Sequence, residues 1–200
     1  MIQDVERTSN AGLASMAYFY FDFKDTGKQD ARALLTSLVI QLCDQSDSFC
    51  DILLNLYSAH RDGSQQPTNG ALAQSLKKMI TTAGQIPIYL IIDALDECPD
   101  TSGLQSSREK VLELVEDLLE SRHPNLRLCI TSRPEIDIRT SLEHRTPESC
   151  RISLHDQSGQ KEDIMDYIRS VVFSDKKMKR WRADDKELVI ETLSARADGM

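Results

Sequence analysis

The chain has 200 residues, of which 40% are hydrophobic and 28% are charged, and it carries a formal net charge of −8. This length and composition suit one globular α/β domain with a sizeable core. The negative charge argues against nucleic acid as a partner, because phosphate backbones are bound by basic surfaces. No apolar stretch is long enough to span a membrane, and the start lacks the pattern of a secretory signal. We therefore expect a cytoplasmic protein with no membrane partner.

Cysteine and histidine usage gives no sign of a zinc site. The five cysteines are odd in number and form no Cys-x-x-Cys pair, and none of the four scattered histidines falls at ligand spacing from a cysteine. Cys43 and Cys129 lie in apolar runs. Both are therefore predicted to be small core residues.

The first 83 residues predict one strand followed by three helices. An aromatic run at 16–23 is typical of a strand, and Asp30 is a candidate cap for a helix over 30–44. Two more helices are expected at 47–59 and 70–83, separated by a polar, linker-like loop.

Residues 88–97 read Ile-Tyr-Leu-Ile-Ile-Asp-Ala-Leu-Asp-Glu, an apolar run that ends in three carboxylates. A strand buried on both faces delivers side chains to its carboxyl end in this way, where open α/β sheets bind ligands. The layout of Asp93, Asp96 and Glu97 is that of a Walker B segment, in which one acid holds Mg²⁺ and another orients water. The alternative is a buried strand followed by a solvated acidic turn.

The next strand supplies a candidate partner for these acids. A capping-box pattern at Ser106 and Glu109 predicts a helix over 106–121, and an apolar strand follows at 126–131. Ser132 and Arg133 come directly after this strand. Adjacent parallel strands would place Arg133 at the same edge of the sheet as the acids, where it could bind a terminal phosphate. The alternative is an exposed arginine at a strand end.

The rest of the chain continues the alternation of helix and strand. The predicted elements are a helix at 134–143, a short strand at 150–154, a helix at 159–173 that Asp156 precedes, and a last helix at 184–197. This order predicts an α/β fold with a mostly parallel sheet and helices on both faces. The basic stretch at 176–182 is more typical of a solvated connection than of a phosphate site.

Taken together, the strand that ends in Asp-Ala-Leu-Asp-Glu and the strand that ends in Thr-Ser-Arg-Pro resemble the NACHT family of signal-transducing P-loop ATPases. The similarity is greatest to fungal NACHT and nephrocystin-like amino-terminal domains of NLR-type proteins. It implies the three-layer fold of P-loop NTPases. It also implies an ATP and Mg²⁺ site in which Asp93 holds the metal, Asp96 and Glu97 polarise the hydrolytic water, and Arg133, helped by Ser132, senses the γ-phosphate.

The motif that wraps the phosphates in this family is missing from the sequence. A P-loop reads Gly, four residues, then Gly-Lys-Ser/Thr. The pair Gly27-Lys28 is followed by Gln29, so it predicts a turn instead. In the family, the P-loop and its strand precede the aromatic strand. We therefore expect the sequence to begin just after the P-loop, with the first strand missing, and ATP and Mg²⁺ not to be retained by these residues alone.

Two functions remain open from the sequence. The first is part of an ATP-dependent signalling switch, with residues 1–174 as a partial nucleotide-binding domain and 175–200 as the start of a helical region. The second is a catalytically inactive remnant that acts only through protein contacts. Without a strand beside it, the sensor strand would expose an apolar edge. Protein partners or self-oligomerisation are therefore expected in addition to ATP in the parent protein.

Overall fold

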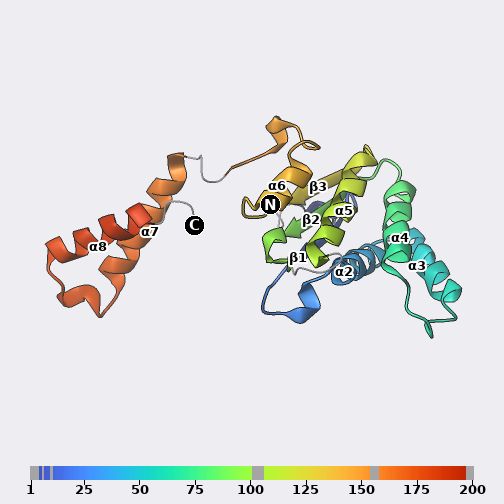
Figure 1. The fold of residues 1–200 in the computed structure, drawn as a ribbon, viewed down its shortest axis with the longest axis horizontal. Coiled ribbons are helices and arrows are strands. Elements are labelled where there is room, and N and C mark those ends of the chain that lie inside the picture. Colours follow the sequence, from blue (N-terminus) through green and yellow to red (C-terminus); the bar gives the residue numbers. More distant parts are fainter. Residues whose placement is uncertain (1–4, 6, 10, 101–105, 154–157, 197–200) are drawn as a thin grey trace. The chain divides into compact units, whose positions relative to one another are not determined.

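A parallel three-stranded sheet forms the centre of the first part of the chain (Figure 1). The computed structural model describes residues 5, 7–9, 11–100, 106–153 and 158–196. The strands are β1 (Ser15–Tyr20), β2 (Ile88–Asp93) and β3 (Leu126–Ile130), in the order β1-β2-β3. Both pairs are parallel, with Tyr20 opposite Asp93 and Ile92 opposite Ile130. All three carboxyl ends therefore meet at one edge of the sheet.

Helices connect the strands in the order that the sequence predicts. They are α2 (Ala31–Cys43), α3 (Asp47–Ala59), α4 (Asn69–Thr82), α5 (Ser107–Glu120) and α6 (Ile136–Leu142). The predicted cap of α2 is confirmed, because the Asp30 side chain accepts a hydrogen bond from the Ala33 N–H at 2.8 Å. The capping box of α5 is also confirmed in both directions between Ser106 and Glu109, at 3.0 Å each.

The core lies between one face of the sheet and helices α2, α4 and α5. Alternate side chains of the strands, such as Ala17, Leu90 and Ile92, are fully buried against these helices. On the opposite face, Ile91 is also buried, whereas Tyr18 is partly exposed. The apolar run at 88–92 is therefore buried on both faces, as its lack of alternation predicts.

The two edges of the sheet differ. At the β1 edge, the amide side chains of Gln41 on α2 and of Gln45, which lies just after α2, bond to the backbone of Tyr18 and Met16, with distances of 2.6 to 3.1 Å. These bonds occupy backbone groups that another strand would otherwise use. At the other edge, no further strand lies beside β3 in the described part of the chain.

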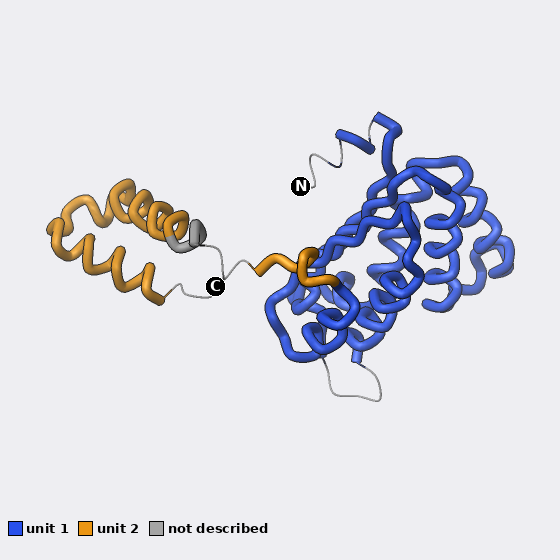
Figure 2. Tube along the Cα trace, turned by 90° about the horizontal axis from the view of Figure 1, so that it is seen from above, with its two compact units in different colours: residues 1–146 blue, residues 147–200 orange. Residues whose placement is uncertain are grey.

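The chain divides into two compact units, residues 1–146 and 147–200 (Figure 2). The second unit contains a hairpin of α7 (Ser158–Ser174) and α8 (Ala183–Arg196), in which Val172 and Ile190 are buried. This division does not test the predicted limits of a nucleotide-binding domain at 1–174 and a helical region at 175–200. Those limits stay a prediction.

The prediction of a strand at 150–154 is wrong for residues 150–153, which the structure describes. Glu148–Cys150 form a 3-10 turn, and residues 151–153 belong to no strand. Ile152, which the strand would have placed in the core, is 77% exposed. The alternating pattern in this segment favours a strand, but a strand forms only where a neighbour accepts its backbone hydrogen bonds. Residue 154 and Asp156, which precedes the helix predicted at 159–173, lie outside the described residues.

Candidate functional site

The carboxyl end of β2 is joined to β3 by the hydroxyl of Thr131. This hydroxyl donates a hydrogen bond to Asp93 Oδ1 and accepts one from the Ala94 N–H at 3.1 Å. Ala94 has a φ of +54°, a left-handed conformation that costs free energy in a residue with a Cβ. The Leu95 N–H also bonds to the Thr131 carbonyl, at 3.0 Å. These bonds hold the strained turn and leave the Asp93 carboxylate exposed at the edge of the sheet.

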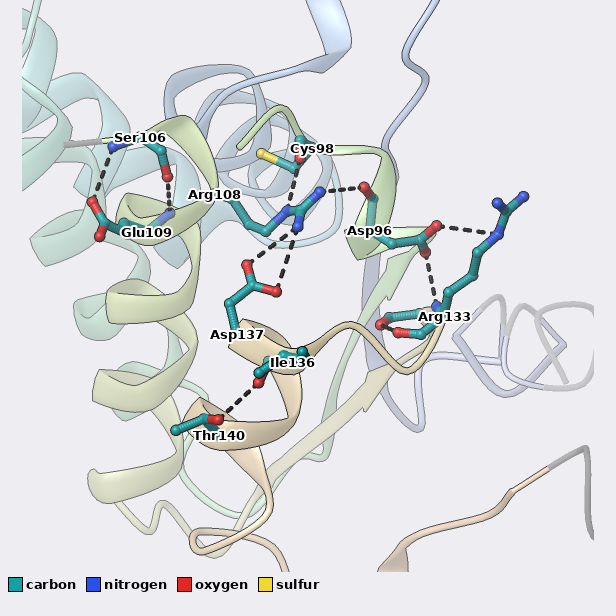
Figure 3. Close-up of polar contacts among 10 residues, drawn as sticks. Asp96, Cys98, Ser106, Arg108, Glu109, Arg133, Ile136, Asp137 and Thr140 are labelled. Carbon is teal, nitrogen blue, oxygen red and sulfur yellow. Dashed lines mark hydrogen bonds and ion pairs between the residues drawn. The ribbon is translucent and has the colours of Figure 1, made fainter. Parts of the chain in front are cut away.

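Asp96 lies in the short 3-10 turn Leu95–Glu97 and faces Arg133 across the two strand ends (Figure 3). Its Oδ1 accepts a hydrogen bond from the Arg133 N–H at 3.0 Å, and its Oδ2 lies 3.5 Å from Arg133 Nε. The Asp96 side chain is only 11% exposed, whereas that of Arg133 is 79% exposed. The Asp96 carboxylate is therefore held by the backbone N–H and the Nε of Arg133, while most of the guanidinium is exposed at the edge of the sheet.

Glu97 connects this turn to the segment after β1. Its Oε2 accepts a hydrogen bond from the Phe23 N–H at 3.2 Å. The carboxylate is half-buried. The structure thus brings together Asp93, Asp96, Glu97 and Arg133 at one edge, as adjacency of the two strands predicts. Ser132 is exposed in the same loop, and its hydroxyl donates to the Arg133 carbonyl.

Arg108 on α5 contacts the acidic turn, and no sequence motif singled it out. Its side chain is 12% exposed. It donates to the carbonyls of Asp96 at 2.7 Å and Cys98 at 2.9 Å, and it forms an ion pair with Asp137 at 3.2 Å (Figure 3). Arg108 therefore ties the acidic turn to α5 and to the first turn of α6. The one sequence signal for Arg108 is its position between Ser106 and Glu109, the two residues of the capping box.

Gly27 and Lys28 form a turn, as predicted. Thr26–Lys28 is a 3-10 turn capped by the Asp25 side chain. Lys28 Nζ lies 2.7 Å from the Tyr20 hydroxyl and 3.9 Å from the centre of its ring. The hydrogen bond to Tyr20 raises the pKa of Lys28. Since Tyr20 is opposite Asp93 in the sheet, this turn adds a cation to the carboxyl edge.

The described acids do not form a complete metal site by themselves. Among the residues that the structure describes, no three Asp, Glu, His or Cys side chains converge as a metal site. Mg²⁺ commonly uses only one or two carboxylates, with water and phosphate oxygens as its other ligands. The exposed carboxylate of Asp93, with one oxygen already oriented by Thr131, meets that requirement.

None of the described helices is long and apolar enough to cross a membrane.

These features define an α/β protein with an all-parallel three-stranded sheet and a polar cluster at the carboxyl edge of that sheet. The family model of the nephrocystin 3 N-terminal domain matches residues 1–133. The chain therefore belongs to the nephrocystin 3 N-terminal family. The match spans all three strands and ends at Arg133. A comparison with curated proteins found no match.

The thiol next to the acidic turn is expected to be inert in the folded protein. Cys98 is completely buried, and burial raises its pKa to about 12, with the guanidinium of Arg108 opposing this shift. Alkylation requires the thiolate, so Cys98 should react roughly 10³-fold more slowly than an ordinary thiol at pH 8. Timed labelling with iodoacetamide, with and without urea, measures this difference. Labelling of Cys98 at the rate of exposed Cys150 would contradict the prediction.

Proposed function

We propose that this chain carries the acid and arginine half of a NACHT-type ATP site in a signal-transducing switch protein. The observation that supports this most strongly is the pairing of Asp96 with Arg133 across the ends of adjacent parallel strands, beside the exposed carboxylate of Asp93. The carboxyl edge of an open α/β sheet is where such folds bind ligands.

Each residue has a distinct role in this proposal. Asp93 would hold Mg²⁺, which supplies charge neutralisation to the phosphates when bound. Glu97 would carry the larger share of orienting the hydrolytic water, since both oxygens of Asp96 already contact Arg133. Arg133 would contact the γ-phosphate, and Ser132 would assist it. Binding of ATP or ADP would then favour different arrangements of the protein, as in switches that signal self or non-self recognition and cell death.

The residues that would wrap the phosphates are not among these 200. No Gly-x₄-Gly-Lys-Ser/Thr motif occurs in the sequence. The proposed site therefore needs a phosphate loop from outside these residues, and residues 1–200 alone are not expected to retain ATP.

The missing loop also favours a second candidate function. A domain that cannot bind phosphates can still act through protein contacts, and the open edge of β3 offers backbone groups for pairing with another chain. In this case the chain would bind a relative with a complete NACHT domain and would show no affinity for nucleotide.

The two candidates are separated by nucleotide binding to the native protein, isolated with every residue that flanks this sequence. We expect binding of a fluorescent ATP analogue that depends on Mg²⁺. Asp93→Asn should remove that dependence and weaken binding by about tenfold, because the amide does not carry the charge that holds the cation. Asp100→Asn, an exposed acid beyond the turn, is the matched control and should bind as the wild type does.

Two results would contradict the proposal. One is binding that stays Mg²⁺-dependent in Asp93→Asn. The other is an absence of binding at saturating nucleotide in a protein that co-purifies with a related NACHT protein, which would instead support the contact function.

A further inference from the structure

Two cysteines face each other at the corner between α2 and α3. Cys43 is the last residue of α2, and Cys50 lies in the first part of α3. Their Sγ atoms are 2.7 Å apart, and Cys50 Sγ donates to the Cys43 carbonyl at 3.1 Å. A disulfide bond is about 2.0 Å long. The two sulfurs therefore need to approach by less than 1 Å to form a bond.

The packing around the corner keeps the thiols together. The neighbour of each cysteine on the chain, Leu42 or Phe49, is buried in the core, with exposed fractions of 0% and 2%. The Cys50 N–H bonds to the Ser46 carbonyl at 3.0 Å, which fixes the start of α3. The two side chains therefore already face each other, and the backbone does not need to rearrange to bring them into contact.

Both thiols are half-buried, in contrast to the completely buried Cys98. The prediction that Cys43 is a core residue is therefore only partly correct. Leu42 is buried in the core, whereas Cys43 is half-buried at the surface of the corner. A small oxidant can reach this position.

We propose that Cys43 and Cys50 are a site of reversible oxidation, at which a hydroperoxide forms a disulfide between α2 and α3. Burial and the hydrogen bond with Cys50 raise the pKa of Cys43 to about 11, so the attacking thiolate is assigned to Cys50. This thiolate attacks the peroxide, the O–O bond breaks, and a sulfenic acid forms on sulfur as water or an alcohol leaves. The second thiol then attacks that sulfur, the S–S bond forms, and a water molecule leaves. With hydrogen peroxide, two thiols and one peroxide give one disulfide and two waters. The site is independent of the proposed nucleotide function.

The product would fix the end of the helix that closes the β1 edge. Gln41 and Gln45, which bond to the β1 backbone, flank Cys43 on the chain. A bond from Cys43 to α3 would restrict the motion of this segment relative to α3. Reduction by a thiol would restore the free pair.

The sequence makes the test direct. Trypsin is expected to release residues 33–61 as one peptide that holds Cys43 and Cys50 and no other cysteine, whereas Cys98, Cys129 and Cys150 fall in separate peptides. The purified full chain is treated with hydrogen peroxide, alkylated with iodoacetamide, digested without reductant and analysed by mass spectrometry. We expect peptide 33–61 to lose the mass of two hydrogens, to carry no alkyl group, and to regain two alkylation sites after treatment with dithiothreitol.

Matched variants define the outcomes. Cys43→Ser and Cys50→Ser should each abolish the internal disulfide, and Cys150→Ser, which removes an exposed thiol elsewhere, should leave its formation unchanged. The proposal is overturned if peptide 33–61 carries two alkyl groups at peroxide doses that oxidise Cys150. It is also overturned if the peptide gains oxygen as sulfinic or sulfonic acid without passing through the disulfide.

Discussion

Arg133→Ala is expected to slow ATP hydrolysis by the native protein by roughly 10³-fold. The side chain is 79% exposed at the carboxyl edge, and in the proposed site this permanently charged donor would stabilise the charge that develops on the transferred phosphoryl group. Asp96 also holds the Arg133 backbone N–H, so the loop should keep its shape without the side chain. Affinity for ATP should change much less than the rate of hydrolysis. Single-turnover hydrolysis and nucleotide titration measure the two quantities separately.

A matched arginine on the same strand provides the control. Arg127 is exposed near the start of β3, and it bonds to the carbonyls of Pro124 and Leu126 rather than to the site. Arg127→Ala should hydrolyse ATP at the wild-type rate. Arg133→Lys should recover only part of the rate, because an ammonium keeps the charge but not the planar fork. Equal rates in Arg133→Ala and Arg127→Ala would remove Arg133 from the site.

Arg108→Met is expected to destabilise the first unit by about 3 kcal/mol. Methionine preserves much of the apolar stem but removes every donor. The carbonyls of Asp96 and Cys98 would lose a charged partner in a poorly hydrated place, and Asp137 would lose its ion pair. Urea unfolding followed by far-ultraviolet circular dichroism measures the change. The single tryptophan, Trp181, belongs to the second unit and does not report on this one.

Arg139 is the appropriate comparison for this measurement. It lies on α6 and pairs with Glu143 at 2.9 Å, but its side chain is 59% exposed. Arg139→Met should change stability by less than about 0.5 kcal/mol, as is usual for exposed pairs on a helix. A loss of similar size in both variants would show that Arg108 does not hold the acidic turn.

The elements that follow from local patterns were predicted closely. The apolar run at 88–93, the capping box before α5 and the cap of α2 each depend on residues a few positions apart, and the structure confirms all three. The proximity of Asp93 to the loop of Arg133 followed from one topological rule, namely that consecutive parallel strands of a crossover unit are neighbours.

Three features that depend on tertiary contacts were not predicted. The alternating pattern at 150–154 resembles a strand, but the described residues there find no strand to pair with. Arg108 acts on backbone carbonyls of Asp96 and Cys98, which carry no signature in their side chains. The pairing of Cys43 with Cys50 depends on the angle of a helical corner. An apolar run indicates burial, but it does not distinguish a core position from the half-buried position beside it.

The nucleotide content of the protein, purified at its natural length, tests the central claim most directly. The protein is purified without added nucleotide, denatured, and the released small molecules are separated and quantified. We expect stoichiometric ATP or ADP together with Mg²⁺, because the acids and Arg133 are already arranged at the carboxyl edge. A folded protein with these residues intact that releases no nucleotide, and binds none when Mg²⁺ and ATP are supplied, would contradict it.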